Sequence, residues 1–64
     1  MNNYESNNIP DDPTLQVGDF IRCKDRDDML NTMHDLIFEG INTEFIYEHN
    51  GQSGLWLEVI SIDN

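Results

Sequence analysis

The stretch DRDDMLNTMHDLIFEG, residues 25–40, predicts one complete helix with both of its ends marked. Asp25 is a suitable N-cap, because its carboxylate can accept a hydrogen bond from a free amide of the first turn. Asp27 and Asp28 add negative charge where the helix dipole favours it. Gly40 suits the C-terminal cap, since glycine adopts the left-handed conformation without strain. The rest of the chain is then expected to supply the surface on which this helix packs.

The predicted helix has an apolar side and an acidic side. Apolar residues recur with the spacing of a single buried stripe: Met29, Leu30, Met33, Leu36 and Ile37. The opposite side carries polar and acidic residues: Asp28, Asn31, Thr32, Asp35 and Glu39. No Lys or Arg stands four residues from Asp35 or Glu39, so no pair along the helix neutralises this acidity. We therefore expect a buried stripe on one side and an exposed acidic face on the other.

Three segments outside the helix have the character of strands. Residues 15–24 (LQVGDFIRCK) contain a strand of about six residues, by their alternation of apolar and polar side chains. Residues 43–49 (TEFIYEH) and 55–62 (LWLEVISI) are rich in aromatic and β-branched residues, and residues 50–54 between them are turn material. The predicted order of elements is strand, helix, strand, strand.

The loop between the last two strands decides which side chains share a face. A loop with an odd number of residues, such as 50–54, places Phe45 and Tyr47 on the same face as Leu55, Leu57 and Val59. A two-residue turn at Asn50-Gly51 would instead put Phe45 beside Trp56 and Glu44 opposite Leu57. The odd loop gives one continuous apolar surface, and we predict it for that reason.

These elements predict a small α+β domain with a three-stranded sheet and one helix packed on one face. The strand-helix-strand crossover is right-handed and makes its two strands parallel, and the last strand is apolar on both faces. The last strand therefore belongs in the middle, which gives the order 1-3-2. The helix is expected to cover Ile21, Cys23, Phe45, Tyr47, Leu57 and Val59. This arrangement is half of a ferredoxin-like unit, and so common a fold implies no function.

The domain organisation follows from a change of composition near residue 15. Residues 1–14 are rich in Asn and acidic residues, contain both prolines and have only isolated apolar residues. Such a segment buries too little apolar surface to offset the entropy of ordering, so we expect a flexible acidic tail. Residues 15–64 form the single predicted domain.

The charge of the chain restricts its partners. Thirteen acidic residues against three basic ones give a formal charge of −10, which repels nucleic acid and anionic membranes and attracts basic protein surfaces. The three cations, Arg22, Lys24 and Arg26, lie close together in the sequence. With one cysteine and no long apolar run, we expect a cytoplasmic protein without an internal disulfide, which binds neither nucleic acid nor membrane directly.

Nothing in the sequence predicts catalysis. Cys23, His34 and His49 are the strong transition-metal ligands, and they lie on three different elements without metal-site spacing. The acidic run 25–28 lacks the glycine and the final glutamate of a calcium loop. We find no phosphate-binding glycine loop and no nucleophile beside a base. We therefore expect a protein that is not an enzyme and has no metal or cofactor.

Two surfaces are candidates for binding a partner. The first is the acidic helix face, formed by Asp27, Asp28, Asp35 and Glu39. The second is the sheet face away from the helix, with Phe20, Arg22, Ile46, Trp56, Glu58 and Ile60. This second face is expected to be uncovered, unless the tail or the stems of Arg22 and Lys24 lie over it, and exposed aromatic clusters are typical of interfaces.

These features predict a small acidic protein-binding module that inhibits or regulates a basic, nucleic-acid-handling protein. Successive acids of the helix face are spaced on the order of phosphates along a strand, so the face could imitate nucleic acid. In composition the chain resembles small, very acidic inhibitors, many of them viral and phage-type, that occupy the nucleic-acid site of their target. The alternative is a homodimeric structural or accessory domain that associates through the apolar sheet face.

Overall fold

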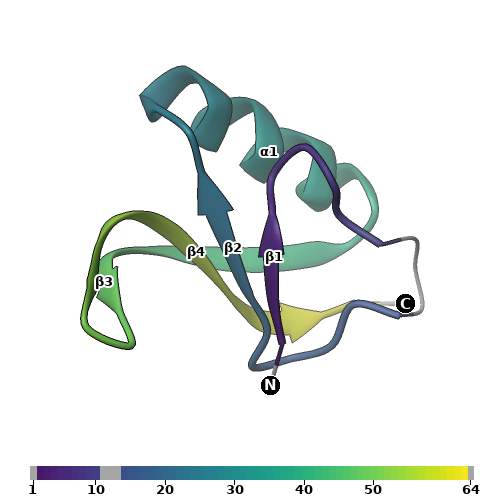
Figure 1. Cartoon of the computed structure of the whole chain (residues 1–64). Coiled ribbons are helices and arrows are strands. Elements are labelled where there is room, and N and C mark those ends of the chain that lie inside the picture. Colours follow the sequence, from purple (N-terminus) through teal and green to yellow (C-terminus); the bar gives the residue numbers. More distant parts are fainter. Residues whose placement is uncertain (1, 11–13, 64) are drawn as a thin grey trace.

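The computed structural model describes residues 2–10 and 14–63, and within them it has one helix and a mixed sheet of four strands. The elements are β1 (Asn3–Glu5), β2 (Phe20–Cys23), α1 (Arg26–Phe38), β3 (Ile41–His49) and β4 (Gln52–Ile62). The sheet order is β1-β2-β4-β3, and α1 lies across one face of the sheet (Figure 1). The predicted α+β class is confirmed. Within the described residues, no helix has both the length and the apolar character needed to cross a membrane.

The three predicted strands lie in the predicted order, but the sheet has a fourth strand that the sequence did not indicate. β2, β4 and β3 correspond to strands 1, 3 and 2 of the prediction, and β1 pairs in parallel with β2. The expectation of a tail without regular structure is therefore wrong for Asn3–Glu5. β1 is held by backbone hydrogen bonds, from Phe20 N to Asn2 O (2.9 Å) and from Ser6 N to Arg22 O (3.0 Å). Because these bonds use main-chain groups, side-chain composition did not reveal them. Residues 1 and 11–13 of the predicted tail lie outside the described residues.

Both predicted caps of α1 are present. The Asp25 carboxylate accepts a hydrogen bond from Asp28 N at 2.8 Å, and Asp27 and Asp28 lie in the first turn. At the other end the helix stops at Phe38, and Gly40 follows with a φ of 80°. A Cβ at Gly40 would collide with the backbone carbonyl of Asp63, whose amide donates to Gly40 O at 2.7 Å. Glycine is thus required at this position both by conformation and by space.

The buried side of α1 is rotated from the predicted stripe. Met29 and Leu36 are buried as expected, but Thr32 is buried too, whereas Leu30 and Ile37 are 44% and 56% exposed. The cause is the segment that follows β1, which turns beside α1 (Figure 1) and lines a groove together with Thr32 and Leu36. The prediction assumed that the helix packs on the sheet alone. The N-terminal segment is a second surface against which α1 packs.

The β3–β4 hairpin combines features of both alternatives for its loop. Asn50 and Gly51 have φ values of 53° and 76°, as a tight two-residue turn requires, so the predicted five-residue loop is wrong. Nevertheless Phe45 pairs with Leu57, and the predicted shared face is confirmed. The reason is a bulge in β4. Between the pairs Glu48–Ser53 and Ile46–Trp56, β3 moves on by two residues and β4 by three, and this extra residue brings Leu57 opposite Phe45. A second register shift, between Asn42 and Thr43, places another extra residue in β4.

The core lies between α1 and the sheet. Its buried members are Leu15, Ile21, Cys23, Met29, Leu36, Ile41, Leu57 and Val59. Tyr4 and Ile9 of the N-terminal segment pack against it. Tyr47, which the sequence placed in the core, is 74% exposed. It lies at the register shift between Ile46 and Glu48, where it has no partner residue on β4 to pack beside.

Candidate functional site

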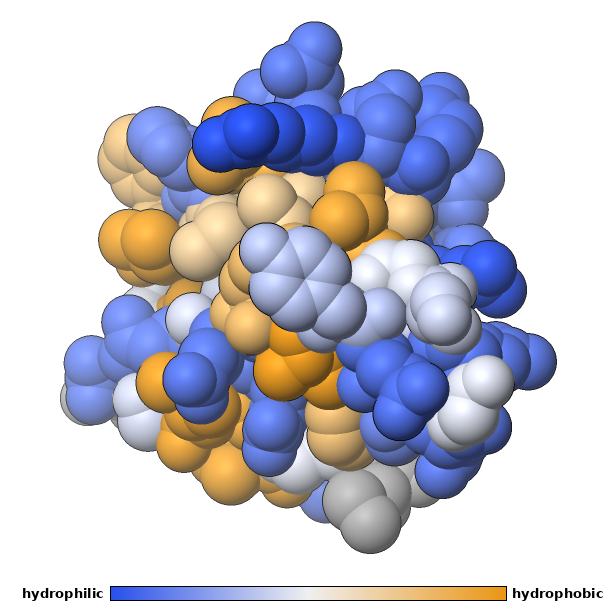
Figure 2. Space-filling model, turned by 90° about the vertical axis from the view of Figure 1, so that its left-hand side faces the viewer, coloured by the Kyte–Doolittle hydropathy of each residue, from blue (hydrophilic) through white to orange (hydrophobic). Residues whose placement is uncertain are grey.

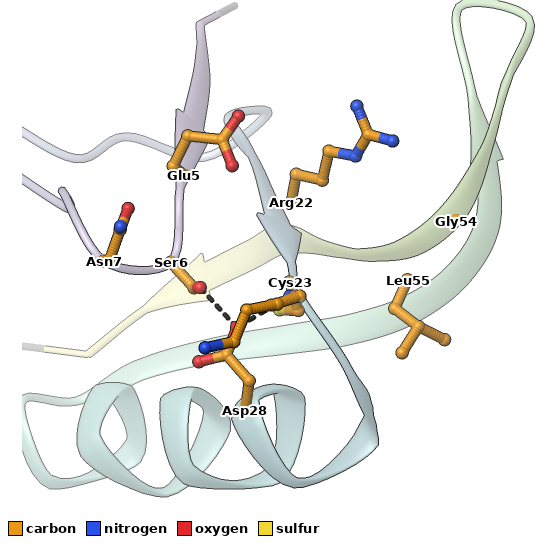
Figure 3. Close-up of a pocket in the computed structure, with 9 residues that line it drawn as sticks. Glu5, Ser6, Asn7, Arg22, Cys23, Asp28, Gly54 and Leu55 are labelled. Carbon is orange, nitrogen blue, oxygen red and sulfur yellow. Dashed lines mark hydrogen bonds between the residues drawn. The ribbon is translucent and has the colours of Figure 1, made fainter.

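The acidic helix face is only partly exposed. Asp27, Asp35 and Glu39 are exposed, as expected from their spacing, whereas Asp28 is half-buried. The Asp28 carboxylate accepts hydrogen bonds from Lys24 N (2.7 Å) and from the Ser6 hydroxyl, which points at it in Figure 3. The Lys24 amide and then the Ser6 hydroxyl lower the pKa of Asp28, since both bonds favour the ionised carboxylate. Asp28 therefore attaches the N-terminal segment to the helix.

Asp35 and Glu39 lie beside a groove between the helix and the N-terminal segment. The groove has a volume of about 320 Å³, and its lining residues come from both walls: Ser6, Asn7, Ile9, Pro10, Thr32, Asp35, Leu36 and Glu39. Within the described residues, neither Asp35 nor Glu39 takes part in a side-chain hydrogen bond of the fold, in contrast to Asp28. The fold thus leaves these two carboxylates available to a cationic partner.

A second pocket, of about 390 Å³, lies where β1, β2 and the start of α1 meet (Figure 3). Its lining carries both signs of charge, from Glu5, Arg22, Lys24 and Asp28, and it includes Cys23. Burial, and then the negative charge of Asp28, raise the pKa of the Cys23 thiol to about 11. The thiol is therefore protonated at neutral pH, which makes it a poor nucleophile and a poor metal ligand.

The structure does not bring the candidate metal ligands together. Cys23 is buried on β2, His34 is exposed on α1, and His49 at the end of β3 is hydrogen-bonded through Nε2 to Asn3 Oδ1 at 3.0 Å. Among residues 2–10 and 14–63, no group of three or more His, Cys, Asp or Glu residues could hold a metal ion.

The sheet face away from the helix is not the exposed aromatic surface that the sequence predicted. Phe20 and Trp56 are only 8% and 3% exposed. The His49 ring stacks on Phe20 at a centroid distance of 3.6 Å and meets Trp56 edge-on at 5.0 Å. The Arg22 guanidinium lies 5.6 Å from the centre of the Trp56 ring. The alternative expected the stems of Arg22 and Lys24 over this patch, and Arg22 does lie over Trp56. The packing of His49 against Phe20 and Trp56 was not predicted.

Three further members of this predicted surface are only partly buried. Ile46 and Glu58 are half-buried, and Ile60 is 46% exposed beside the second bulge. Trp56 also satisfies its polar atom within the hairpin, because Nε1 donates to Gln52 O at 3.2 Å. The Phe20–Trp56 cluster is therefore packed within the chain itself, while Ile60 remains exposed.

An apolar groove on the helix side of the hairpin was missed by the sequence analysis. It is lined by Arg26, Met29, Phe45, Tyr47 and Leu55. Phe45 and Tyr47 meet edge-to-face at 4.5 Å, and the outer ring, Tyr47, is largely exposed. Figure 2, which looks from the left of Figure 1, shows apolar side chains gathered in the middle of that face. The sequence feature that could have indicated this groove is the pair of aromatic residues, Phe45 and Tyr47, on one face of β3.

Comparison with known proteins finds no match: no protein-family model, no curated protein and no solved structure is detectably similar to this chain.

Proposed function

We propose that this protein is a small acidic binding module that docks on a basic surface of a partner protein. The proposal is supported by the arrangement of charge on α1. Arg26 begins the helix, and because an α-helix rises about 1.5 Å per residue, Glu39 lies about 20 Å further along the axis. The end of the helix that carries Asp35 and Glu39 is thus well separated from the three cations at residues 22, 24 and 26. A basic partner would meet uncompensated negative charge there.

The observation that carries the proposal is the exposure of Asp35 and Glu39 on the rim of the groove. The two carboxylates are one helical turn apart, about 6 Å along the axis, which is on the order of the spacing of phosphates in a nucleic-acid strand. A protein that handles nucleic acid is a fitting target, because its binding surface already presents Lys and Arg at such a spacing. Occupation of that surface would inhibit or regulate the target.

Homodimerisation through the Phe20–Trp56 face is not part of the proposal. Central aromatic residues contribute to association when they become buried in the complex, and these two are already buried within one chain. The two aromatic rings therefore offer little further area for a second copy to bury.

Charge reversal of the helix face tests the proposal. The immobilised chain is exposed to nuclease-treated host lysate, and bound protein is eluted with increasing salt. We expect the wild-type chain to capture a basic protein and to release it at moderate salt, because salt screens the attraction between their charges. The double variant Asp35→Lys, Glu39→Lys should not capture this protein, because the attraction at the helix face becomes a repulsion. The matched control is Glu5→Lys combined with Asp63→Lys, which changes the net charge equally at two other exposed sites.

Two outcomes contradict the proposal. If the control variant loses the protein to the same extent, total charge rather than the helix face is responsible. If both variants retain it, the partner binds elsewhere. Circular dichroism of each variant confirms that the fold is unchanged, since substitutions at exposed sites usually alter stability by under about 0.5 kcal/mol.

A further inference from the structure

One edge of the sheet is formed by a long strand. β3 has nine residues and pairs with β4 on one side, and within the described chain no strand pairs with its other side. The backbone groups that point away from β4 therefore have no partner in the sheet. Long edge strands of this kind are able to accept a further strand, and most proteins shorten or cover them. The opposite edge, β1, has only three residues.

The register across the sheet specifies which side chain a strand added at β3 should carry on the helix side. Ile21, Leu57 and Phe45 form one row across β2, β4 and β3. Ile21 and Leu57 are completely buried and Phe45 is half-buried, so the row is apolar and becomes exposed at the edge. An apolar side chain beside Phe45 would continue the row and enter the groove formed with Met29, Tyr47 and Leu55.

The neighbouring row specifies the charge. Phe20, Glu58 and Glu44 lie across the same three strands, so Glu44 stands directly opposite Glu58. Like charges that face each other across two strands repel. β3 contains no Lys or Arg and has a second glutamate, Glu48, which is also exposed. A cation next to Glu44 would pair with it and relieve a repulsion already present in the sheet.

We propose that the free edge of β3 binds an extended segment of a partner protein by strand addition. The segment carries an apolar residue beside Phe45 and a Lys or Arg beside Glu44, so apolar and basic residues alternate along it. A second copy of this chain fits less well, because two chains each of charge −10 repel and β3 has no cation to offer. This inference goes beyond the proposed function, because it assigns a different surface from Asp35 and Glu39 and depends on neither residue.

A designed peptide provides the probe. It has nine residues, like β3. Lysine occupies every odd position, and threonine, leucine, valine and threonine occupy the even positions in that order. A second peptide of the same composition groups its lysines together, and so keeps the charge without the alternation. Each is titrated into the ¹⁵N-labelled full chain. We expect the alternating peptide to shift the amide resonances of β3 and to slow their hydrogen exchange, and the grouped peptide to bind more weakly without this pattern.

Two matched variants separate strand addition from general charge attraction. Glu44→Lys should weaken binding of the alternating peptide about tenfold, because an attraction is replaced by a repulsion at the contact. Glu5→Lys changes the net charge equally on the opposite edge of the sheet, where Glu5 is exposed, and should weaken binding by less than about twofold. Glu44→Lys also removes the repulsion with Glu58, so loss of the fold is not a concern for this variant.

Three results would overturn the inference. These are equal binding of the two peptides, equal weakening of binding by the two variants, and shifted amides near Asp35 and Glu39 instead of in β3. A fourth observation would identify a different occupant: if the β3 amides of the free protein become protected as protein concentration rises, the edge pairs with a second copy. If charge reversal at Asp35 and Glu39 does not change partner capture, the peptide-binding results for β3 still stand, so the two proposals are tested separately.

Discussion

The two edges of the sheet differ in length and in the way they are attached. β1 has three residues, while β3 has nine and is a full member of the hairpin with β4. β1 depends on polar side chains that come from elsewhere in the chain. The Asp19 carboxylate accepts hydrogen bonds from Asn2 N (3.0 Å) and Gln16 N (2.8 Å), and Asp28 accepts one from Ser6.

This difference shows how a small domain can attach a short edge strand through side chains and build a long edge strand into a hairpin. The Asp19 side chain is 2% exposed, so its two hydrogen bonds are shielded from water. His49 joins the N-terminal strand to the end of β3 through Asn3, which links the two edges on the face away from the helix. Polar side-chain contacts therefore hold β1 in place beside β2, and mutation of these contacts tests the difference between the two edges.

The largest effect is expected in β4, which lies between the two edges. Leu57 is completely buried and pairs with Ile21 on one side and Phe45 on the other. Truncation of a buried leucine typically costs about 2–5 kcal/mol, which is comparable to the whole stability of a small domain. Leu57→Ala should be largely unfolded by circular dichroism at 25 °C. A melting temperature within a few degrees of wild type would contradict the register described here.

An intermediate effect is expected from Asp19→Ala. The substitution leaves the amides of Asn2 and Gln16 without their acceptor in a buried site, which costs about 1–3 kcal/mol. Backbone amides of β1 and its junction with β2 should lose protection from hydrogen exchange, while those in β3 and β4 keep it. Asp35→Ala is the control, because it removes the same charge from an exposed site. Equal loss of protection across all strands of Asp19→Ala would show that β1 is not a separate unit.

The smallest effect is the pH dependence contributed by Asp28. Its pKa is lowered from the ordinary 3.8 by the hydrogen bonds from Lys24 N and Ser6. The ionised carboxylate therefore stabilises the folded state above the unfolded pKa, and this contribution is lost as the pH falls through the lowered value. Urea unfolding of wild type and Asp28→Asn should differ by under about 1 kcal/mol at neutral pH, and the two should converge in acid. Asp27→Asn is the control, and a constant difference across the pH range would contradict the assignment.

Features encoded by local sequence could be predicted, and features created by contacts between distant segments could not. The caps at Asp25 and Gly40 follow from residue type, and the order of β2, β4 and β3 follows from apolar patterning. β1 escaped prediction because three residues joined by main-chain hydrogen bonds leave no side-chain pattern. The burial of Thr32 was missed for the same reason, since the segment after β1 covers it.

The candidate sites divide in the same way. The exposure of Asp35 and Glu39 could be predicted from helical spacing alone. The burial of Phe20 and Trp56 could not, because alternation along a strand assumes an uncovered face, whereas His49 reaches over this one from the end of β3. The edge position of β3 followed from the predicted strand order, but the residues opposite Phe45 and Glu44 were known only from the register.

Hydrogen exchange of the free protein at low concentration is the most direct test of the difference between the two edges. We expect Ser6 N and Phe20 N, which bond across β1 and β2, to exchange slowly. In β3 we expect an alternating pattern, with slow exchange for amides that bond to β4 and fast exchange for those on the free edge. Slow exchange of every β3 amide, or exchange of Ser6 and Phe20 at the rate of an unstructured peptide, would contradict this difference between the edges.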